Sequence, residues 1–472
     1  MEILLSFISC LILISLVGFA AIRKSKSSTQ DYLLAGRDIG PVPMALSAAS
    51  SKISGFMFIG MVGYTYVNGL SSIWLLLGWI LGDWLIWKLF YKKIREESEK
   101  TECMTITAFA ASDKSGKLIS RKLLLVLSSL VLIFMTLYAS AQLNANAKAL
   151  ESLLNLSPEI NILIGAFIIA LYCLFGGIRA DVWTDTAQSV IMLIAMLLLA
   201  YLGITECNGF TGLIHKLKAI DPNLLNPLPK NLEYGFILFF ISRLANGLAL
   251  LGQPHVIVRA MLIKKVQDLK EAEWVYFSYY ISFCVAMFLV SLSSRAILPE
   301  LISGDPEQAL PELSLSLLPK ILVGLVLAGI FSSTISTADS QVLACTSCLT
   351  QDIFTKLKDN YVANKLVTLG VLSTVTILAL NGNRNVFNLT MIGWSSLGAI
   401  FVPLIIIRLL KIELNAKKII FILSISLISS LFWRYCSSLN SSIDDVLIAF
   451  VAAFISTCLI KLYDKSKESL NM

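Results

Sequence analysis

The chain has 472 residues, a formal net charge of +7, 56% hydrophobic residues and only 15% charged residues. A soluble domain carries about 25% charged residues, so this composition excludes an ordinary soluble protein and favours a membrane protein. Apolar stretches of about 20 residues, the length of a membrane-spanning helix, recur along the whole chain. Strands of a membrane barrel alternate in polarity over about ten residues, so the longer uniform stretches predict helices instead.

Thirteen of these stretches are predicted to cross the membrane, and together they leave no room for a soluble domain. The expected fold is therefore an all-α integral membrane protein with about 13 transmembrane helices, in which residues 1–472 form a single domain. In chain order the predicted spans are residues 3–22, 42–66, 70–91, 122–147, 159–177, 181–204, 232–252, 272–297, 317–344, 362–381, 386–409, 418–434 and 443–461.

The charges between the spans predict their orientation. Arg23, Lys24 and Lys26 follow the first span instead of preceding it, which predicts a retained helix with its N-terminus outside. Segment 92–122 contains eight Lys and Arg residues, whereas segment 299–312 has four acidic residues and no basic one. Because basic loops stay in the cytoplasm, we predict a multi-pass protein of the bacterial cytoplasmic (inner) membrane with a cytoplasmic C-terminus. The positive charge is then a topology signal, and no nucleic-acid partner is expected.

Cysteines and histidines show no spacing typical of a catalytic or metal site. The nine cysteines are scattered, and there are only two histidines. Cys345 and Cys348 form a CxxC pair, but no second such pair lies near them, which argues against zinc or redox chemistry. No nucleophile–base arrangement stands out either. We therefore expect no enzyme activity, no organic cofactor and no obligatory protein partner.

The second and seventh spans contain residues that weaken a helix. Ser54 and Gly55 lie in a Ser- and Gly-rich part of the second span, and the seventh span ends at Gly252, followed by Pro254. Close packing of small residues is one explanation. We favour the other, a pair of broken helices at corresponding positions of two halves, because this pattern marks the binding site of many transporters.

The two interrupted spans are five spans apart, as two inverted five-helix repeats require. Residues 42–204 are then the first repeat and residues 232–409 the second. Residues 3–22 and 418–461 are expected to be accessory helices.

Ionisable residues inside the predicted spans are costly to bury and therefore indicate function. The candidates are Lys52, Asp83, Asp185, Arg243 and Asp339. For Asp83 and Asp339 a purely structural role as hydrogen-bond acceptors is an equal alternative.

The ninth span places four hydroxyl groups on one helix face. Ser333, Ser336, Thr337 and Ser340 follow the spacing i, i+3, i+4 and i+7. Hydrogen bonding between helices is one explanation. Beside a broken helix with free carbonyl groups, we favour a site for a small cation such as Na⁺, which prefers hard oxygen ligands.

Seven short segments, each weak by itself, carry a resemblance to a known family. They are residues 31–37, 45–48, 54–55, 176–177, 183–186, 252–255 and 336–341. In this order they resemble the sodium:solute symporters, and most closely the bacterial sodium/proline symporters. The resemblance implies thirteen helices, an N-terminus outside and a leucine-transporter-like 5+5 inverted repeat.

The resemblance also implies a sodium site between the second and ninth spans. Asp185 matches an acid of the family that is implicated in ion coupling. For the substrate, Tyr138 matches a pocket tyrosine of the proline transporters, and Phe56 stands in place of their pocket tryptophan. The implied sodium ligands are the backbone carbonyls of Ser50 and Ile53 together with Ser333, Ser336 and Thr337.

Three residues depart from the pattern of the proline transporters. Lys52 replaces an aspartate within the sodium segment, Asn246 replaces a tryptophan and Leu250 a tyrosine. We predict that the Lys52 ammonium takes the place of the ion, with hydroxyls of the ninth span as acceptors and Asp185 as counter-charge. Transport would then be coupled to H⁺ or be uncoupled. The alternative is that Lys52 extends into a water-filled vestibule and leaves the sodium site intact.

The expected substrate site lies between the breaks of the second and seventh spans. Asn246 offers both a donor and an acceptor, and Arg243 can clamp a carboxylate with two hydrogen bonds. Alternatively, Arg243 pairs with an acid on a neighbouring helix, such as Asp83. The candidate residues are Ser54, Phe56, Tyr138, Arg243, Asn246, Leu250 and Pro254.

The predicted function is a symporter that takes up a small organic solute by alternating access, with proline or another amino acid as the expected substrate. The coupling ion is Na⁺ by resemblance, and H⁺ if Lys52 takes its place. The alternatives are transport of an organic acid such as pantothenate, a non-transporting sensor and a degenerate homologue. The small solute and the lipid bilayer are the expected partners.

Overall fold

The computed structural model describes residues 1–22, 29–113, 115–154, 156–229, 232–358, 360–436 and 443–470, and within this part of the chain it contains helices but no strand. The basic residues Arg23, Lys24, Lys26 and Lys114 of the predicted topology lie outside the described residues. The helices are α1 (Glu2–Ile22), α2 (Thr29–Leu34), α3 (Pro41–Gly55), α4 (Met61–Asn68), α5 (Ile73–Ile86), α6 (Lys92–Lys100), α7 (Ile106–Ala110), α8 (Arg121–Leu154), α9 (Pro158–Glu206), α10 (Gly209–Ile220), α11 (Gly235–Leu248), α12 (Pro254–Leu262), α13 (Leu269–Ile297), α14 (Ala309–Leu317), α15 (Lys320–Ser347), α16 (Tyr361–Asn381), α17 (Val386–Leu409), α18 (Ala416–Tyr435) and α19 (Asp445–Leu470).

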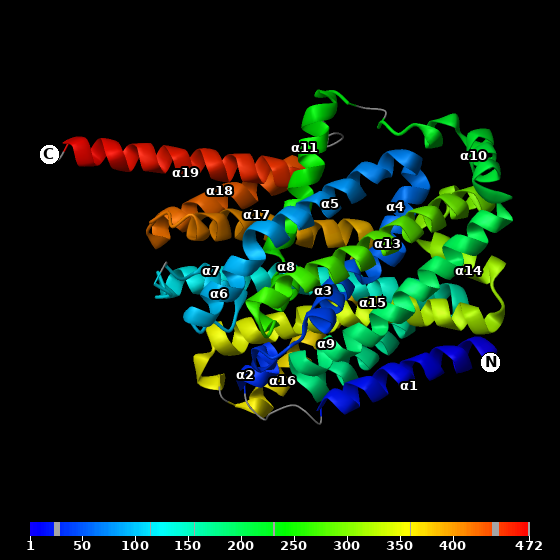
Figure 1. Ribbon diagram of the computed structural model, residues 1–472, viewed down its shortest axis with the longest axis horizontal. Helices are drawn as coiled ribbons and strands as arrows, with labels where there is room; N and C mark the ends of the chain where they lie inside the picture. The colour runs from blue at the N-terminus through cyan, green and yellow to red at the C-terminus, as the bar shows by residue number, and fades with distance from the viewer. Residues whose placement is uncertain are drawn as a thin grey trace.

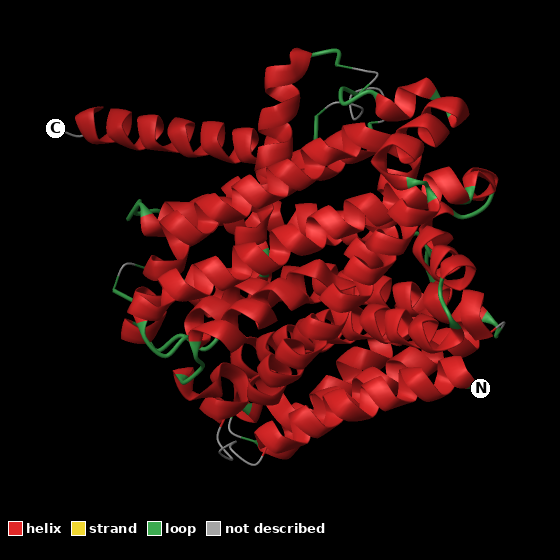
Figure 2. Ribbon diagram, turned by 45° about the vertical axis from the view of Figure 1, so that its right-hand side comes forward, coloured by secondary structure: helices red, strands yellow, loops and turns green. Residues whose placement is uncertain are grey.

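The long helices pack side by side into one bundle, with α3 and α15 near its centre (Figure 1). Helix α1 runs along one edge of the bundle. Helix α19 projects from the bundle on the side opposite the N-terminus (Figures 1 and 2). These peripheral helices expose large apolar side chains, among them Leu5 and Leu13 on α1 and Phe454 and Leu462 on α19. In contrast, nearly all of α15 from Val323 onward is buried. An apolar surface around a buried centre is what a lipid-embedded bundle requires.

Ten helical ranges among the described residues are long and apolar enough to cross a membrane. One of them, Pro41–Lys100, is 60 residues long and contains both the second and the third predicted spans. Glu2–Gly18 and Pro158–Leu171 are shorter apolar helices at the places of the first and fifth spans. These findings confirm an all-helical protein with many membrane spans.

Two predicted spans end where the helix is interrupted. The fifth and sixth spans both lie in α9, which is interrupted between them at Gly177, where φ is 57° and ψ is −172°. Glycine adopts this left-handed φ without a steric cost, and an added Cβ would lie 2.6 Å from the Tyr32 ring. The helical range Gly235–Gly252 ends where the seventh predicted span ends, and after the extended Gln253 the chain resumes as α12 at Pro254, which buries Arg259.

Short helices lie in segments that the sequence assigns to loops. They are α2, α6, α7, α10, α12 and α14. Near α14, Lys148 of α8 forms ion pairs with Asp305 at 2.7 Å and with Glu307 at 2.6 Å. Glu307 also accepts hydrogen bonds from the backbone N–H groups of Val386 and Phe387 at the start of α17. These bonds fasten the segment between α13 and α15 onto the ends of α8 and α17.

Candidate functional site

Helix α3 is broken at Ser54, which has φ 51° and ψ 173°. The backbone N–H groups next to the break donate hydrogen bonds to nearby side-chain oxygen atoms. The N–H of Gly55 donates to Oε1 of Gln142 at 2.9 Å, and the N–H of Phe56 donates to the Ser54 hydroxyl at 3.1 Å. An added Cβ at Gly55 would lie 2.3 Å from the methyl carbon of Thr334, so glycine lets α15 approach closely here. The predicted interruption of the second span is therefore present.

The chain is interrupted again between α11 and α12. Residues Ala249–Gly252 form a 3₁₀ turn, Gln253 is extended with φ −98° and ψ 98°, and Pro254 begins α12. The side-chain amide of Gln253 donates to the carbonyl of Ala249 at 3.2 Å and to that of Trp394 in α17 at 3.0 Å. The interruption predicted for the seventh span is thus also present, and Gln253 bonds it to α17.

The predicted cation residues of α3 and α15 meet on the buried side of the first break. The hydroxyl oxygens of Ser50 and Ser336 are 2.9 Å apart. Thr337 donates to the carbonyl of Ser51 at 3.0 Å, and Ile53 is fully buried one residue before the break. The Ser333 hydroxyl, in contrast, donates to the carbonyl of Ile330 within its own helix. Hydroxyl and carbonyl oxygens of two helices are therefore gathered in one buried place, and their chemistry suits a small hard cation.

The side chain of Lys52 does not reach these hydroxyl groups. Its ammonium forms a buried ion pair with Asp83 of α5 and lies 3.9 Å from the ring centroid of Tyr280 in α13. Tyr276 donates a second hydrogen bond to the same Asp83 oxygen, at 2.8 Å. The predicted contact of Lys52 with hydroxyls of the ninth span and with Asp185 is wrong, because the side chain leaves α3 toward α5 and α13.

Asp185 belongs to a different buried network. Its carboxylate accepts from Ser47 at 2.5 Å and from Arg259 of α12 at 3.2 Å. Arg259 also pairs with Asp181 at 2.5 Å and donates to Ser340 of α15 at 2.7 Å. Residues 181 and 185 are one helical turn apart, so one guanidinium can reach both acids. Asp181 was not singled out by the sequence analysis, although its spacing from Asp185 was visible, and Arg259 was assigned to a loop.

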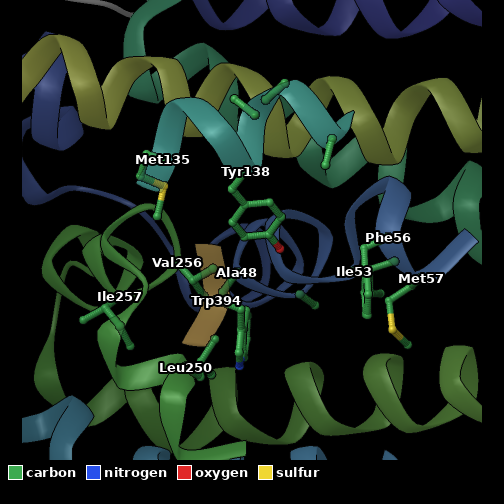
Figure 3. Close-up of a cluster of buried hydrophobic side chains, with 14 of the residues drawn as sticks. Ala48, Ile53, Phe56, Met57, Met135, Tyr138, Leu250, Val256, Ile257 and Trp394 are labelled. Atoms are coloured by element: carbon green, nitrogen blue, oxygen red, sulfur yellow. The ribbon is translucent and has the colours of Figure 1, made fainter. Parts of the chain in front are cut away.

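A small buried cavity lies next to the first break, on the side of Lys52. Its volume is about 20 Å³, room for about one water molecule. Figure 3 shows Phe56, Met57, Tyr138 and Trp394 gathered in this part of the core. Five of its nine lining residues are aromatic, and four of these come from α5, α8, α13 and α17. The lining residues are Lys52, Phe56, Met57, Trp79, Tyr138, Tyr280, Thr390, Met391 and Trp394.

Phe56 and Tyr138 are thus the predicted substrate residues that line this cavity, with Ser54 at the adjacent break. Asn246 lies behind the wall, where its side-chain oxygen accepts from the indole N–H of Trp79 at 3.0 Å and its backbone carbonyl accepts from that of Trp394 at 3.0 Å. Tryptophans from α5 and α17 thus line the cavity in front of Asn246. Sequence reasoning missed Trp79 and Trp394, because nothing local indicates which tryptophans converge.

Three further predicted substrate residues do not line the cavity. Arg243 pairs with Asp444 at 2.6 Å, as in the alternative in which it pairs with an acid on a neighbouring segment, but that acid is not Asp83. Leu250 is fully buried in the 3₁₀ turn between α11 and α12. Pro254 lines a second cavity of about 40 Å³, together with Asp181, Arg259 and Ser340.

Comparison with known proteins gives these two sites a context. The sequence profile of the sodium:solute symporter family matches residues 32–419. The osmoregulated proline transporter OpuE of Bacillus subtilis is 29% identical over 475 residues, which cover 98% of this chain and 95% of the relative. The sodium/proline symporter of Staphylococcus aureus strain JH9 is 32% identical over 412 residues, which cover 84% of this chain and 79% of the relative.

Solved structures agree on the fold. A Na⁺-coupled sialic acid symporter in a substrate-bound, outward-open state has a TM-score of 0.79 at 15% identity, and the match covers 97% of this chain and 98% of that one. The nucleobase-cation-symport-1 transporter Mhp1 has a TM-score of 0.57 at 13% identity, with coverage of 92% and 95%. At these identities the structures are evidence for a shared fold alone. The profile match over most of the sequence goes further and confirms the expected resemblance: the chain is a member of the sodium:solute symporter family.

Proposed function

We propose that this protein imports proline into the bacterial cell together with Na⁺, by alternating access across the cytoplasmic membrane. One observation carries the proposal: two features lie at the same break of α3. They are the contact of α3 with α15, which is rich in oxygen atoms, and a cavity lined mainly by aromatic side chains. Three bacterial relatives, each named as a proline transporter or symporter, supply the substrate.

The coupling cation binds between α3 and α15. Its proposed ligands are the carbonyls of Ser50 and Ile53 and the residues Ser333, Ser336 and Thr337. Carbonyl groups next to a helix break can coordinate Na⁺, because they lack their usual helical partners. The ion pair of Lys52 with Asp83 supports Na⁺ over H⁺, since the charge that was expected to replace the ion is held by another helix.

The substrate binds in the aromatic cavity. Proline presents a compact apolar ring, and the faces and edges of Phe56, Trp79, Tyr138 and Trp394 offer apolar surface of the kind that such rings bury. A volume of about 20 Å³ is too small for it, so the cavity must widen as the bundle opens. The tilted contact of Phe56 with Phe387, at 5.3 Å between ring centroids, is a contact that such a movement would separate.

The proposed topology has thirteen spans, an N-terminus outside and a cytoplasmic C-terminus. Residues 42–204 and 232–409 are the two inverted repeats, and α1, α18 and α19 are accessory helices. Two observations support this arrangement. Breaks are present in the second and the seventh spans, and the accessory helices α1 and α19 expose apolar side chains.

Uptake into proteoliposomes tests the proposal. A panel of labelled solutes, including proline, other amino acids and pantothenate, is offered with a Na⁺ gradient and a pH gradient imposed separately. We expect proline to accumulate only under the Na⁺ gradient and to be unaffected by a proton uncoupler. Uptake driven by the pH gradient without Na⁺ would refute the coupling ion, and preference for another solute would refute the substrate.

A further inference from the structure

A buried cation forms part of the wall of the proposed substrate cavity. Lys52 lies two residues before the break of α3, and its side chain is 4% exposed. Asp83 of α5 and the Tyr280 ring of α13 hold its ammonium from two sides. Three helices therefore fix one positive charge at the cavity, where sequence reasoning had expected that charge inside the cation site.

The ammonium has hydrogen-bonding capacity that the protein does not use. It carries three N–H donors, and Asp83 is its one hydrogen-bond acceptor among the described residues. The Tyr280 ring offers only a cation–π contact. A ligand that enters the cavity can therefore accept a hydrogen bond from Lys52 without displacing Asp83.

The rest of the cavity wall determines which ligand group this would be. Lys52 is its only charged lining residue in the part of the chain that the structure describes, and aromatic and apolar side chains dominate the remainder. A carboxylate loses its hydration when it enters such a cavity. A hydrogen bond from a cation is needed to compensate for that loss. Apolar rings opposite a single cation fit a small acid with an apolar body.

We propose that Lys52 binds the carboxylate of the transported substrate and thereby restricts transport to small monocarboxylic acids, among them amino acids. Asp83 is a positioning residue, since it acts through Lys52. The inference rests on the proposed function only in taking this cavity as the transport site. A Lys52 that binds the substrate carboxylate distinguishes an acid from its amide, whereas a Lys52 that forms only a structural ion pair with Asp83 would not.

The test compares an acid with its amide, because the amide keeps the ring and the amine but loses the negative charge. Binding of L-proline and of L-prolinamide to purified protein in nanodiscs is measured at saturating Na⁺. We expect the wild type to prefer the acid by about 10- to 100-fold, the factor for a hydrogen bond to a charged group. Lys52→Met should abolish this preference, and Lys52→Arg should retain part of it.

Matched variants separate binding from folding. Lys148→Met removes another buried, ion-paired lysine that does not line the cavity, and the acid-to-amide ratio should stay at the wild-type value. Where Lys52→Met alone does not fold, Lys52→Met with Asp83→Asn removes both charges of the pair and gives the same ratio measurement. The sodium concentration for half-maximal binding of the amide should not change in either variant.

Either of two binding results would overturn the inference: a wild type that binds the amide as tightly as the acid, or a folded Lys52→Met variant that keeps the wild-type ratio. If the uptake panel identifies a solute other than proline, the assignment of proline fails separately. The acid and amide of that solute then form the test pair, and a solute without a carboxylate would itself overturn the role of Lys52.

Discussion

Removing the Arg259 guanidinium should destabilise the protein far more than removing an arginine from an exposed ion pair. Arg259 is 1% exposed and lies between α3, α9 and α15. Its loss leaves the carboxylates of Asp181 and Asp185 buried without their cation. Its hydrogen-bond acceptors are Asp181 at 2.5 Å, Ser340 at 2.7 Å, the carbonyl of His255 at 2.8 Å, Ser47 at 3.1 Å and Asp185 at 3.2 Å.

Breaking a buried ion pair by removing one partner costs about 3–5 kcal/mol, because the other charge remains without compensation. The pair of Arg384 with Glu151 is the matched control, since its side chains are 37% and 36% exposed. Exposed pairs contribute about 0–1 kcal/mol. Arg259→Met should therefore lower the free energy of unfolding by about 3–5 kcal/mol, and Arg384→Met by less than about 1 kcal/mol.

The assay is denaturant unfolding of the purified variants in detergent, followed by tryptophan fluorescence. Adding Asp181→Asn to Arg259→Met should recover part of the loss, because it removes one of the two uncompensated charges. If Arg259→Met were no less stable than Arg384→Met, the network would not be held by these charges, and the reasoning from burial would be wrong.

Three further predictions concern the ion, the substrate and the topology. Thr337→Ala should raise the Na⁺ concentration for half-maximal uptake by about tenfold, the factor for one lost oxygen partner. Ser347→Ala on the same helix is the control and should leave this concentration unchanged. Equal effects of the two substitutions would contradict the cation site. Asn246→Ala removes the side-chain oxygen that accepts from Trp79 and should change the ranking of substrates in competition assays, so a uniform loss of all rates would argue against a role in selectivity. In a background without native cysteines, a membrane-impermeant thiol reagent should label Ser303→Cys from outside and leave Ser115→Cys unlabelled; the reverse pattern would contradict the topology.

The sequence by itself determined the helices and the places where they break. Long apolar segments can only be helical in a bilayer, and the Ser- and Gly-rich stretch around Ser54 and the residues around Pro254 are local features whose conformational effect does not depend on the rest of the chain. The hydroxyl face of α15 followed from helical periodicity in the same way. These parts of the prediction needed only neighbouring residues.

Only the tertiary structure decided where the buried charges and the cavity walls lie. Lys52 was expected beside Ser336, but its side chain leaves α3 in another direction and meets Asp83, which lies 31 residues later in the chain. Trp79 and Trp394 line one cavity, although 315 residues separate them in the chain. Which faces of two helices meet depends on their rotation and crossing, and hence on packing across the whole bundle, and no local pattern of residues contains that information.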